Sequence, residues 1–390
     1  PGLWRHPLRK GAYQPAGAPL RLRAAQPPLV VKDEIKLRFA VDGDDRIGAD
    51  RRFGATLTLR CTAAVDRETG GFSRYLQNDV WARVGNTYRP MNYRDQLKKS
   101  IESALGENFI VDGIGFFEAL APPKPVREAG EEGWLEKPIA YVVLQAKDPS
   151  IDRLPAISMD LHFNDTAGPV VLPILSNAPP IDAASEPGPR PTRSLKVVQV
   201  LDLRGIDAPD SERAVTLEIT ARGDGVLPEL DELLEGVRTA LPGYDVAEDG
   251  IETRPINLLA EDAPSANRFF MAAPEKAKDY IEPDEAGFYR LPTERSWVVT
   301  YTPASGSVGD AFTLPTLRAG LDGTLASKQF ADMDLVEVTS ATIAVERSRS
   351  ASMIAVLAAL VATMSGLAVV LWSRRRTAPA EGVADRVPHR

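Results

Sequence analysis

The sequence predicts a mainly β protein with inserted helices, organised as two related β-sandwich-like domains followed by one transmembrane helix. Many short runs alternate apolar and polar residues, which is the pattern of strands with one buried face. The 32 prolines are too many for a helical bundle and suit short strands and turns. An uncharged apolar run near the carboxyl end is long enough to cross a bilayer.

Residues 1–28 are basic and rich in proline, and we expect a flexible lead-in there. The first β-rich domain is predicted over residues 29–177. Its apolar residues keep helical spacing from Tyr93 to Leu105, and Gly106 is a natural stop. Alternation or apolar runs predict its strands at 35–41, 57–62, 139–144, 157–163 and 170–172.

Residues 178–193 contain five prolines and predict a linker between domains. The second β-rich domain is predicted over residues 194–347. Pro228 should open a helix whose leucines form one apolar stripe up to Leu241. Strands are expected at 215–221, 297–301, 312–314 and 335–345.

The two domains share sequence markers in the same order. Asp-Gly-Ile occurs at Asp112–Ile114 and again at Asp249–Ile251, and Leu-Pro occurs at Leu172–Pro173 and again at Leu314–Pro315. Both markers recur at nearly one offset, about 140 residues, which is the signature of an internal repeat. We therefore expect a duplication, with a helix inserted in each copy.

Charge is distributed unevenly along the chain. Residues 1–28 carry five basic and no acidic residues, and residues 374–390 carry five arginines against two acidic residues. With a total of −8, these ends of +5 and +3 leave −16 for residues 29–373. An acidic body would repel phosphates, so nucleic acid is excluded as its expected partner.

The predicted membrane helix runs from Met353 to Trp372 without a charged residue. Trp372 suits the membrane interface, and Arg374, Arg375 and Arg376 follow it closely. Such a basic cluster stays cytoplasmic under the positive-inside rule. We expect a single-pass protein of the inner membrane, with its long N-terminal region extracytoplasmic and residues 373–390 as a cytoplasmic tail. A buried core helix is the alternative.

Small residues recur every fourth position within this predicted helix, at Ala358, Ala362 and Gly366. Such a line permits close contact between two membrane helices, and we predict one here. The alternative is that alanine and glycine are simply common in membrane spans.

The loop 42–50 is the strongest candidate metal site, and Asp332 and Asp334 are a weaker one. Asp42, Asp44 and Asp50 supply hard oxygen ligands at short spacing, as calcium requires. Arg46 stands where a ligand would be wanted, however, and no bidentate glutamate follows at the expected distance. A solvated hairpin loop is therefore the alternative interpretation.

Other chemistry-bearing residues form no recognisable pattern. The three histidines have no zinc-ligand spacing, and His162 is expected on the outward face of its strand. Cys61 is the only cysteine and falls on the apolar side of its strand, which predicts a small core residue. No catalytic constellation, phosphate loop or cofactor motif is visible, so we expect neither a catalytic function nor a cofactor.

A family resemblance arises from the second domain. The residues that carry it are Trp297–Thr302, a glycine-containing turn at Ser305–Gly309, Phe312–Leu317, and Asp322–Gly323 before the last strand and the membrane segment. This pattern resembles the repeat of BatD-like aerotolerance proteins over residues 288–376. The resemblance implies membrane-anchored, periplasmic immunoglobulin-like repeats that associate with von Willebrand A-domain proteins and a MoxR-type ATPase system. The inserted helices depart from the family pattern.

These observations favour a protein-interaction or scaffold function at the outer face of a bacterial inner membrane. Its expected partners are other membrane or periplasmic proteins. Three alternatives remain open: a calcium-dependent adhesin, a membrane-anchored hydrolase, and a sensor that passes signals inward. The short basic tail leaves little room for the output module that a sensor needs.

Overall fold

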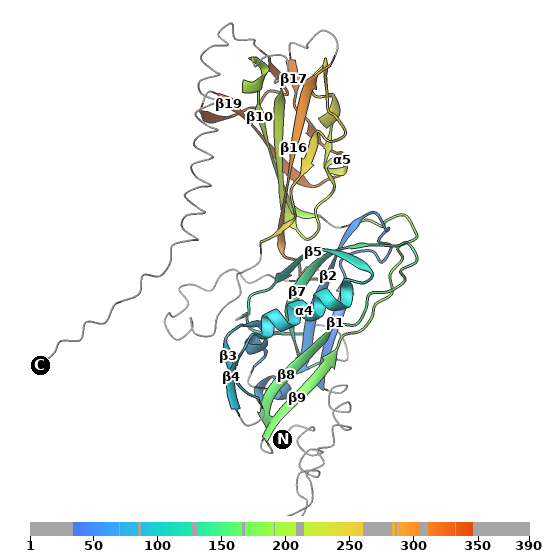
Figure 1. Ribbon diagram of the computed structural model, residues 1–390, viewed down its shortest axis with the longest axis vertical. Coiled ribbons are helices and arrows are strands. Elements are labelled where there is room, and N and C mark those ends of the chain that lie inside the picture. Colours follow the sequence, from blue (N-terminus) through green and yellow to red (C-terminus); the bar gives the residue numbers. More distant parts are fainter. Residues whose placement is uncertain are drawn as a thin grey trace, which may run out of the picture.

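The computed structural model describes residues 34–345, apart from 70, 85–86, 120, 127–130, 166–167, 191, 208–213, 260–282, 285–286, 305–310 and 332. The chain is mainly β, as predicted. Two β-rich units follow one another along the long axis of the molecule (Figure 1). We call residues 34–190 the first unit and residues 192–345 the second unit.

The first unit is built on an antiparallel sheet in the order β1-β2-β7-β5, with the short strand β6 also paired to β7. Two hairpins, β3–β4 and β8–β9, lie outside this sheet. The strands are β1 (Ile35–Val41), β2 (Arg52–Thr62), β3 (Val80–Val84), β4 (Thr87–Met91), β5 (Phe109–Phe116), β6 (Lys124–Pro125), β7 (Trp134–Ala146), β8 (Ser158–Asp165) and β9 (Gly168–Leu175).

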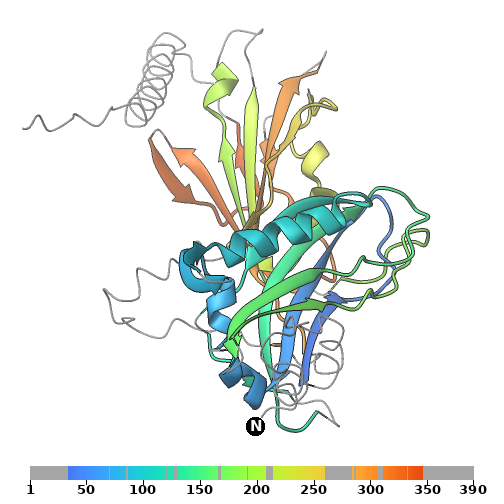
Figure 2. The same cartoon turned by 60° about the horizontal axis from the view of Figure 1, so that its bottom comes forward.

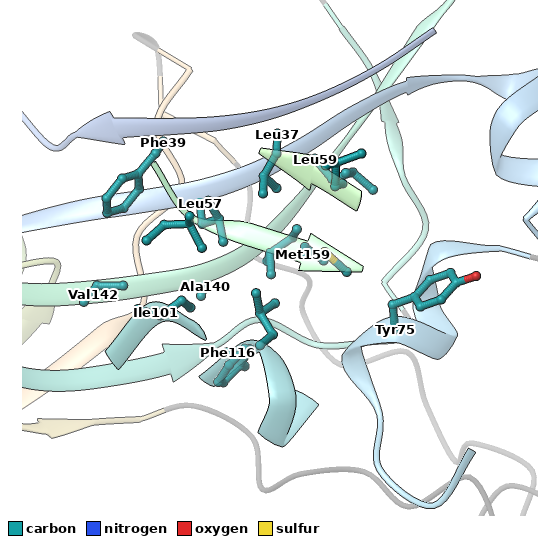
Figure 3. Close-up of a cluster of buried hydrophobic side chains, with 14 of the residues drawn as sticks. Leu37, Phe39, Leu57, Leu59, Tyr75, Ile101, Phe116, Ala140, Val142 and Met159 are labelled. Atoms are coloured by element: carbon teal, nitrogen blue, oxygen red, sulfur yellow. The ribbon is translucent and has the colours of Figure 1, made fainter. Parts of the chain in front are cut away.

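Helix α4 (Tyr93–Leu105) covers one face of this sheet together with hairpin β8–β9 (Figure 2). Its buried residues Leu97, Ile101 and Leu105 recur at helical spacing, and Gly106 ends it as predicted. They pack into a core with alternating residues of β1 and β2, such as Phe39 (Figure 3). The unit also contains the short helices α3 (Ala63–Glu68) and η1 (Phe72–Leu76).

The central strand β7 is buried on both faces. Ala140, Val142 and Leu144 point into the core of the first unit, whereas Tyr141 and Val143 point to a separate cluster shared with the second unit. Double burial explains the continuous apolar run in this strand, because neither face meets water.

The second unit has a sheet in the order β13-β16-β11-β10-β19-β20, with β14 and β15 also paired to β16. Within it, β10 and β19 are parallel and the other pairs are antiparallel. The strands are β10 (Arg193–Asp202), β11 (Val215–Asp224), β12 (Leu234–Glu235), β13 (Tyr244–Asp245), β14 (Ile251–Thr253), β15 (Asn257–Leu258), β16 (Pro292–Pro303), β17 (Ala311–Thr313), β18 (Thr316–Leu317), β19 (Gly323–Ala331), β20 (Asp334–Glu337) and β21 (Thr342–Ala344).

The predicted helix after Pro228 is wrong in its length. Only α5 (Leu230–Leu233) is helical, and the chain then turns at Gly236, whose φ of 81° ends the helical path. Between them β12 pairs with β18, so Leu234 bonds to another strand instead of continuing the helix. The apolar residues of the predicted stripe are buried as predicted. Part of them, however, lie in strand β12 and in the 3₁₀ turn η3 (Val237–Thr239) instead of in a helix.

The two sheets share one strand order. The first unit has β1-β2-β7-β5, and the second has β10-β11-β16-β14, with every pair antiparallel. In each sheet, the first strand of this order also has a parallel neighbour on its other edge. In the first unit Ser176 forms a parallel bridge with Leu37 of β1, and in the second unit β19 pairs in parallel with β10. The repeated Asp-Gly-Ile markers lie within β5 and at the start of β14, which are equivalent positions in this order.

Candidate functional site

The loop that joins β1 to β2 contains the predicted calcium ligands, and its first aspartate is not solvated. Asp42 is 4% exposed. Its carboxylate accepts hydrogen bonds from Arg290 of the second unit, with Nη2 2.6 Å from Oδ1, and from the Tyr141 hydroxyl at 2.8 Å. The predicted solvated hairpin loop is therefore wrong at Asp42, because a buried carboxylate needs a cationic partner and finds one in the other unit.

The other two predicted ligands point elsewhere. Asp44 pairs with Arg46, Nη2 to Oδ2 at 2.9 Å, and hydrogen bonds from Arg46 hold the pKa of Asp44 well below its usual range. Asp50 is exposed. Across the described parts of residues 34–345, no group of three or more histidine, cysteine or acidic side chains is placed to hold a metal ion. The structure thus does not bring the three aspartates together as a ligand set.

Arg290 is the centre of the contact between the units. Besides Asp42, it pairs with Asp284, and both the Arg290 and Asp42 side chains are only 5% exposed. The two carboxylates raise the pKa of the Arg290 guanidinium, in spite of its burial. The Thr56 hydroxyl also donates to the backbone oxygen of Tyr289 at 2.8 Å, which holds the same segment to the sheet of the first unit.

Apolar side chains surround this charged centre. Phe117, Tyr141 and Val143 of the first unit form one buried cluster with Tyr289 and Leu291 of the second. The rings of Phe117 and Tyr289 meet edge to face, with centroids 6.2 Å apart. A low-polarity surround of this kind strengthens the attraction between the buried charges.

Gly54 of β2 makes room for the Tyr141 ring. A Cβ atom at Gly54 would lie 1.9 Å from the Tyr141 hydroxyl oxygen, so only glycine fits beneath this side chain. The missing side chain at Gly54 therefore allows Tyr141 to reach Asp42.

A second group of ion pairs joins the units at another point. Arg52 of the first unit contacts Asp112 and also Glu229 of the second unit, both at 2.7 Å. Glu229 in turn accepts from Arg295 at 2.7 Å, and the two arginines lower the pKa of Glu229. The two units are thus held by a buried apolar cluster and two charged networks.

Residues 178–190, in the segment predicted as a linker, follow the surface of the first unit. Ile181 and Ala183 are buried. The Arg190 guanidinium donates to the backbone oxygens of Asp42 at 2.9 Å and Asp44 at 2.7 Å. These contacts fix the loop that presents Asp42 to the second unit.

A cavity of about 500 Å³ lies beside the contact between the two units, which we call the junction, between the sheet of the first unit and residues 283–284 and 287–289. Its charged lining residues are Arg38, Arg60, Lys124, Glu136 and Asp284. Arg60 is paired with Glu136 at 2.5 Å and with Glu131 at 2.8 Å. The charge of Arg60 is therefore balanced by carboxylates of the chain.

Lys137 is a buried cation on the core side of the first unit. Its Nζ donates to the backbone oxygens of Ala119 and Ala121, both at 2.6 Å, and to Ser73 Oγ at 3.0 Å. Burial lowers the pKa of this ammonium to about 8. Cys61 is buried as predicted, and burial raises the pKa of its thiol to about 12, which keeps it protonated and unreactive.

Hairpin β3–β4 exposes two large aromatic side chains. Trp81 is 61% exposed and Tyr88 is 65% exposed, while Ala82 and Met91 are buried beneath them. The hairpin follows Asp79, whose backbone N–H donates to Asn92 Oδ1 at 3.0 Å, next to the start of α4. The hairpin is thereby fixed at its base while its outer face meets solvent.

His162 of β8 lies on the face opposite to the buried Leu161 and Phe163, as predicted, but it is only half-exposed because it packs against Tyr93. Its ring lies 5.6 Å from the ring of Tyr93, and its Nδ1 is buried without a hydrogen-bond partner among the described residues. Desolvation lowers the pKa of His162, and the nearby Arg89 and Arg74 lower it further, against the opposing charge of Asp160.

We expect His162 to make the protein less stable in mild acid. The His162 side chain of the unfolded chain takes up a proton near the ordinary pKa of about 6.5, whereas in the folded chain it does so only at lower pH. The contribution of His162 to the free energy of unfolding is therefore fully present above pH 6.5 and is lost as the pH falls toward the lower folded-state pKa. The urea midpoint of the full-length chain should fall between pH 7 and 5. His162→Gln should reduce this dependence, and an unchanged profile would contradict the assignment.

Sequence reasoning missed the residues that matter most here. Arg290 lies in a segment without a recognisable motif, and its partner Asp42 is 248 residues away in the sequence. Lys137 lies in an otherwise ordinary strand, and its acceptor Ala119 belongs to a loop 18 residues away. Trp81 and Tyr88 carried a usable signal, because two aromatic residues on either side of a short polar turn suit a hairpin.

The predicted membrane anchor lies outside the described residues. This applies to the helix from Met353 to Trp372, to Arg374–Arg376 and to the small-residue line at Ala358, Ala362 and Gly366. Among the helices that the structure describes, none is long and apolar enough to span a bilayer. The anchor therefore stays a prediction from the sequence.

No protein-family model matches the chain, and no curated protein matches it either. The resemblance to BatD-like proteins therefore stays a prediction that depends on the residues alone.

Proposed function

We propose that this chain is a non-catalytic interaction or scaffold protein, anchored in a bacterial inner membrane by residues 353–372 and exposed on the outer side. Its partners would be membrane or periplasmic proteins, with von Willebrand A-domain proteins and a MoxR-type ATPase system as the candidates that the family resemblance implies. In this proposal the two units are related β-sandwich-like domains, and their matching strand orders support a common origin by duplication.

One observation carries the proposal: the described chain ends where a membrane anchor would hold both units away from the bilayer. The last strand, β21, pairs with β17 at the end of the second unit that is remote from the first (Figure 1). Only residues 346–352 separate Val345 from the apolar run that begins at Met353. Because the buried junction holds the two units together, the first unit would then be presented at a fixed distance from the membrane.

The test is purification of the full-length chain from membranes of its own host, together with its neighbours. We expect the chain to need detergent for extraction, to be cleaved by protease added outside spheroplasts, and to bring down an envelope protein in constant ratio. A variant lacking residues 353–372 should leave the membrane fraction. A chain that stays in solution without detergent would contradict the placement, and a clean monomer would contradict the scaffold function.

A second candidate function is an anchored hydrolase, favoured by the contact between Ser73 and Lys137. A serine beside a lysine of lowered pKa is one arrangement that can supply a nucleophile and its base. The Lys137 ammonium also donates to the carbonyls of Ala119 and Ala121, and these bonds favour its charged form. As a neutral amine, Lys137 would keep two N–H groups for these carbonyls and accept from the Ser73 hydroxyl with its lone pair.

A fluorophosphonate probe decides between the two functions. Labelling of the full-length chain that disappears in Ser73→Ala would favour the hydrolase. No labelling at pH 9, where much of Lys137 is neutral, would remove it and leave the scaffold function in place.

A further inference from the structure

We propose that the outer face of hairpin β3–β4 is the docking surface of this protein, and that it binds an acidic segment of a partner protein. The inference deepens the proposed scaffold function and rests on it. The hairpin face consists of Trp81, Arg83, Tyr88 and Pro90.

The register of the hairpin brings these four side chains together. Trp81 lies directly opposite Pro90, and Arg83 lies directly opposite Tyr88. Residues two apart on a strand share a face, so the two pairs are adjacent on the same side. All four residues are exposed, and the opposite face of the hairpin buries Val80, Ala82 and Met91 against the first unit. Tryptophan, tyrosine and arginine are the residue types that dominate binding energy at protein interfaces.

The charges of the face indicate the chemistry of the partner. Arg83, the charged residue of this face, has no carboxylate within ion-pair distance among the residues that the structure describes. Arg89 lies opposite Ala82 and therefore on the other face of the hairpin, where it lines a cleft of about 330 Å³ with Asp95 and Lys99. Arginines elsewhere on the surface, such as Arg204 and Arg254, are paired within the chain. The body of the protein carries a net charge of −16, so a basic aromatic patch on it is a local exception. Complementary charge therefore points to carboxylates on the partner.

The position of the hairpin favours a protein over a lipid surface. Figure 1 places β3–β4 and β17 at opposite ends of the molecule. Because β21, the last described strand before the predicted anchor, pairs with β17, the hairpin would be at the end farthest from the anchoring membrane. A patch in that place can reach an envelope protein but not the headgroups next to its own anchor.

The test uses the full-length chain in its own host, with the photo-crosslinking residue p-benzoylphenylalanine in place of Tyr88. We expect an adduct with another protein whose crosslinked peptide carries excess aspartate and glutamate. Arg83→Glu should reduce the yield by about tenfold, because an attraction to the partner's carboxylates becomes a repulsion. The matched control, Arg238→Glu, reverses one exposed charge on the second unit and should leave the yield unchanged.

Several outcomes would overturn the inference. An adduct with lipid, with a second copy of this chain or with a basic peptide would show that the occupant is of another class, and no adduct would remove the surface altogether. The same crosslinker in place of Leu335, exposed on β20, separates the two proposals. A protein adduct from that position alone would overturn the hairpin surface and keep the scaffold function, and no adduct from either position would contradict both.

Discussion

Arg290→Leu should lower the free energy of unfolding by about 3–5 kcal/mol, the usual cost of removing one partner from a buried ion pair. The reason is that the Asp42 carboxylate would stay in a buried site without the guanidinium that pairs with it, whereas Asp284 keeps Arg193 as a second partner. Tyr141 would still donate one hydrogen bond to Asp42, which is too little to compensate a buried carboxylate. Urea unfolding of the purified full-length chain at pH 7 measures the effect.

The control is an exposed arginine in an ion pair of similar length. Arg254 contacts Glu218 at 2.9 Å, with both side chains about half exposed, and Arg254→Leu should cost no more than about 1 kcal/mol. Asp42→Asn added to Arg290→Leu should recover part of the loss, because it removes the carboxylate that has lost its partner. Equal effects of the Arg290 and Arg254 variants would mean that the junction is solvated and does not hold the units together.

The strands and α4 could be predicted because their signals are local. Alternation from Ile35 to Val41 and helical spacing from Tyr93 to Leu105 each require only that one face be buried, and both elements form as predicted. The segment after Pro228 has the same helical pattern, yet it breaks after Leu233. There, pairing of Leu234 with Leu317 competes with the helix. A partner more than 80 residues away cannot be detected from the pattern of neighbouring residues in the sequence.

The junction could not be predicted for the same physical reason. Asp42 lies in a loop of charged residues and glycines, which is the composition of a solvated turn. Its burial depends on Arg290, which is 248 residues away, and on Gly54, whose missing Cβ admits the Tyr141 ring. Lys137 is similar: an apparently ordinary strand lysine is buried because two backbone oxygens of another loop surround its ammonium.

The junction and the hairpin face have complementary roles in the proposed function. A docking surface transmits force or fixes a spacing only if it is attached firmly to its anchor, and two units joined by a flexible linker would do neither. The contacts of Arg290 and Arg52 across the units supply that attachment. Arg290→Leu is therefore also expected to leave crosslinking at the hairpin intact while loosening the spacing between the partner and the membrane.

Lys137 should make the protein more stable as the pH rises from 7 to 9.5. Burial lowers the folded-state pKa of Lys137 to about 8 from an ordinary 10.5, so over this window the unfolded chain binds more protons than the folded chain. Stability then increases with pH, because removing that proton costs the unfolded state more than the folded state. At 1.36 kcal/mol for each unit of pKa difference, the gain from this one group is about 2 kcal/mol by pH 9.5.

The measurement is the difference between wild type and Lys137→Met in urea unfolding at several pH values. The variant has a different stability at pH 7, since Ala119 and Ala121 lose their donor, but only the slope of the difference tests the assignment. Lys98→Met, a change at an exposed helix position, should run parallel to wild type. The window ends below pH 10, where tyrosines such as Tyr75, whose pKa burial raises, begin to act in the opposite direction. If the difference stays constant up to pH 9.5, the three oxygens around Nζ hold the ammonium charged, and Ser73 has no base beside it.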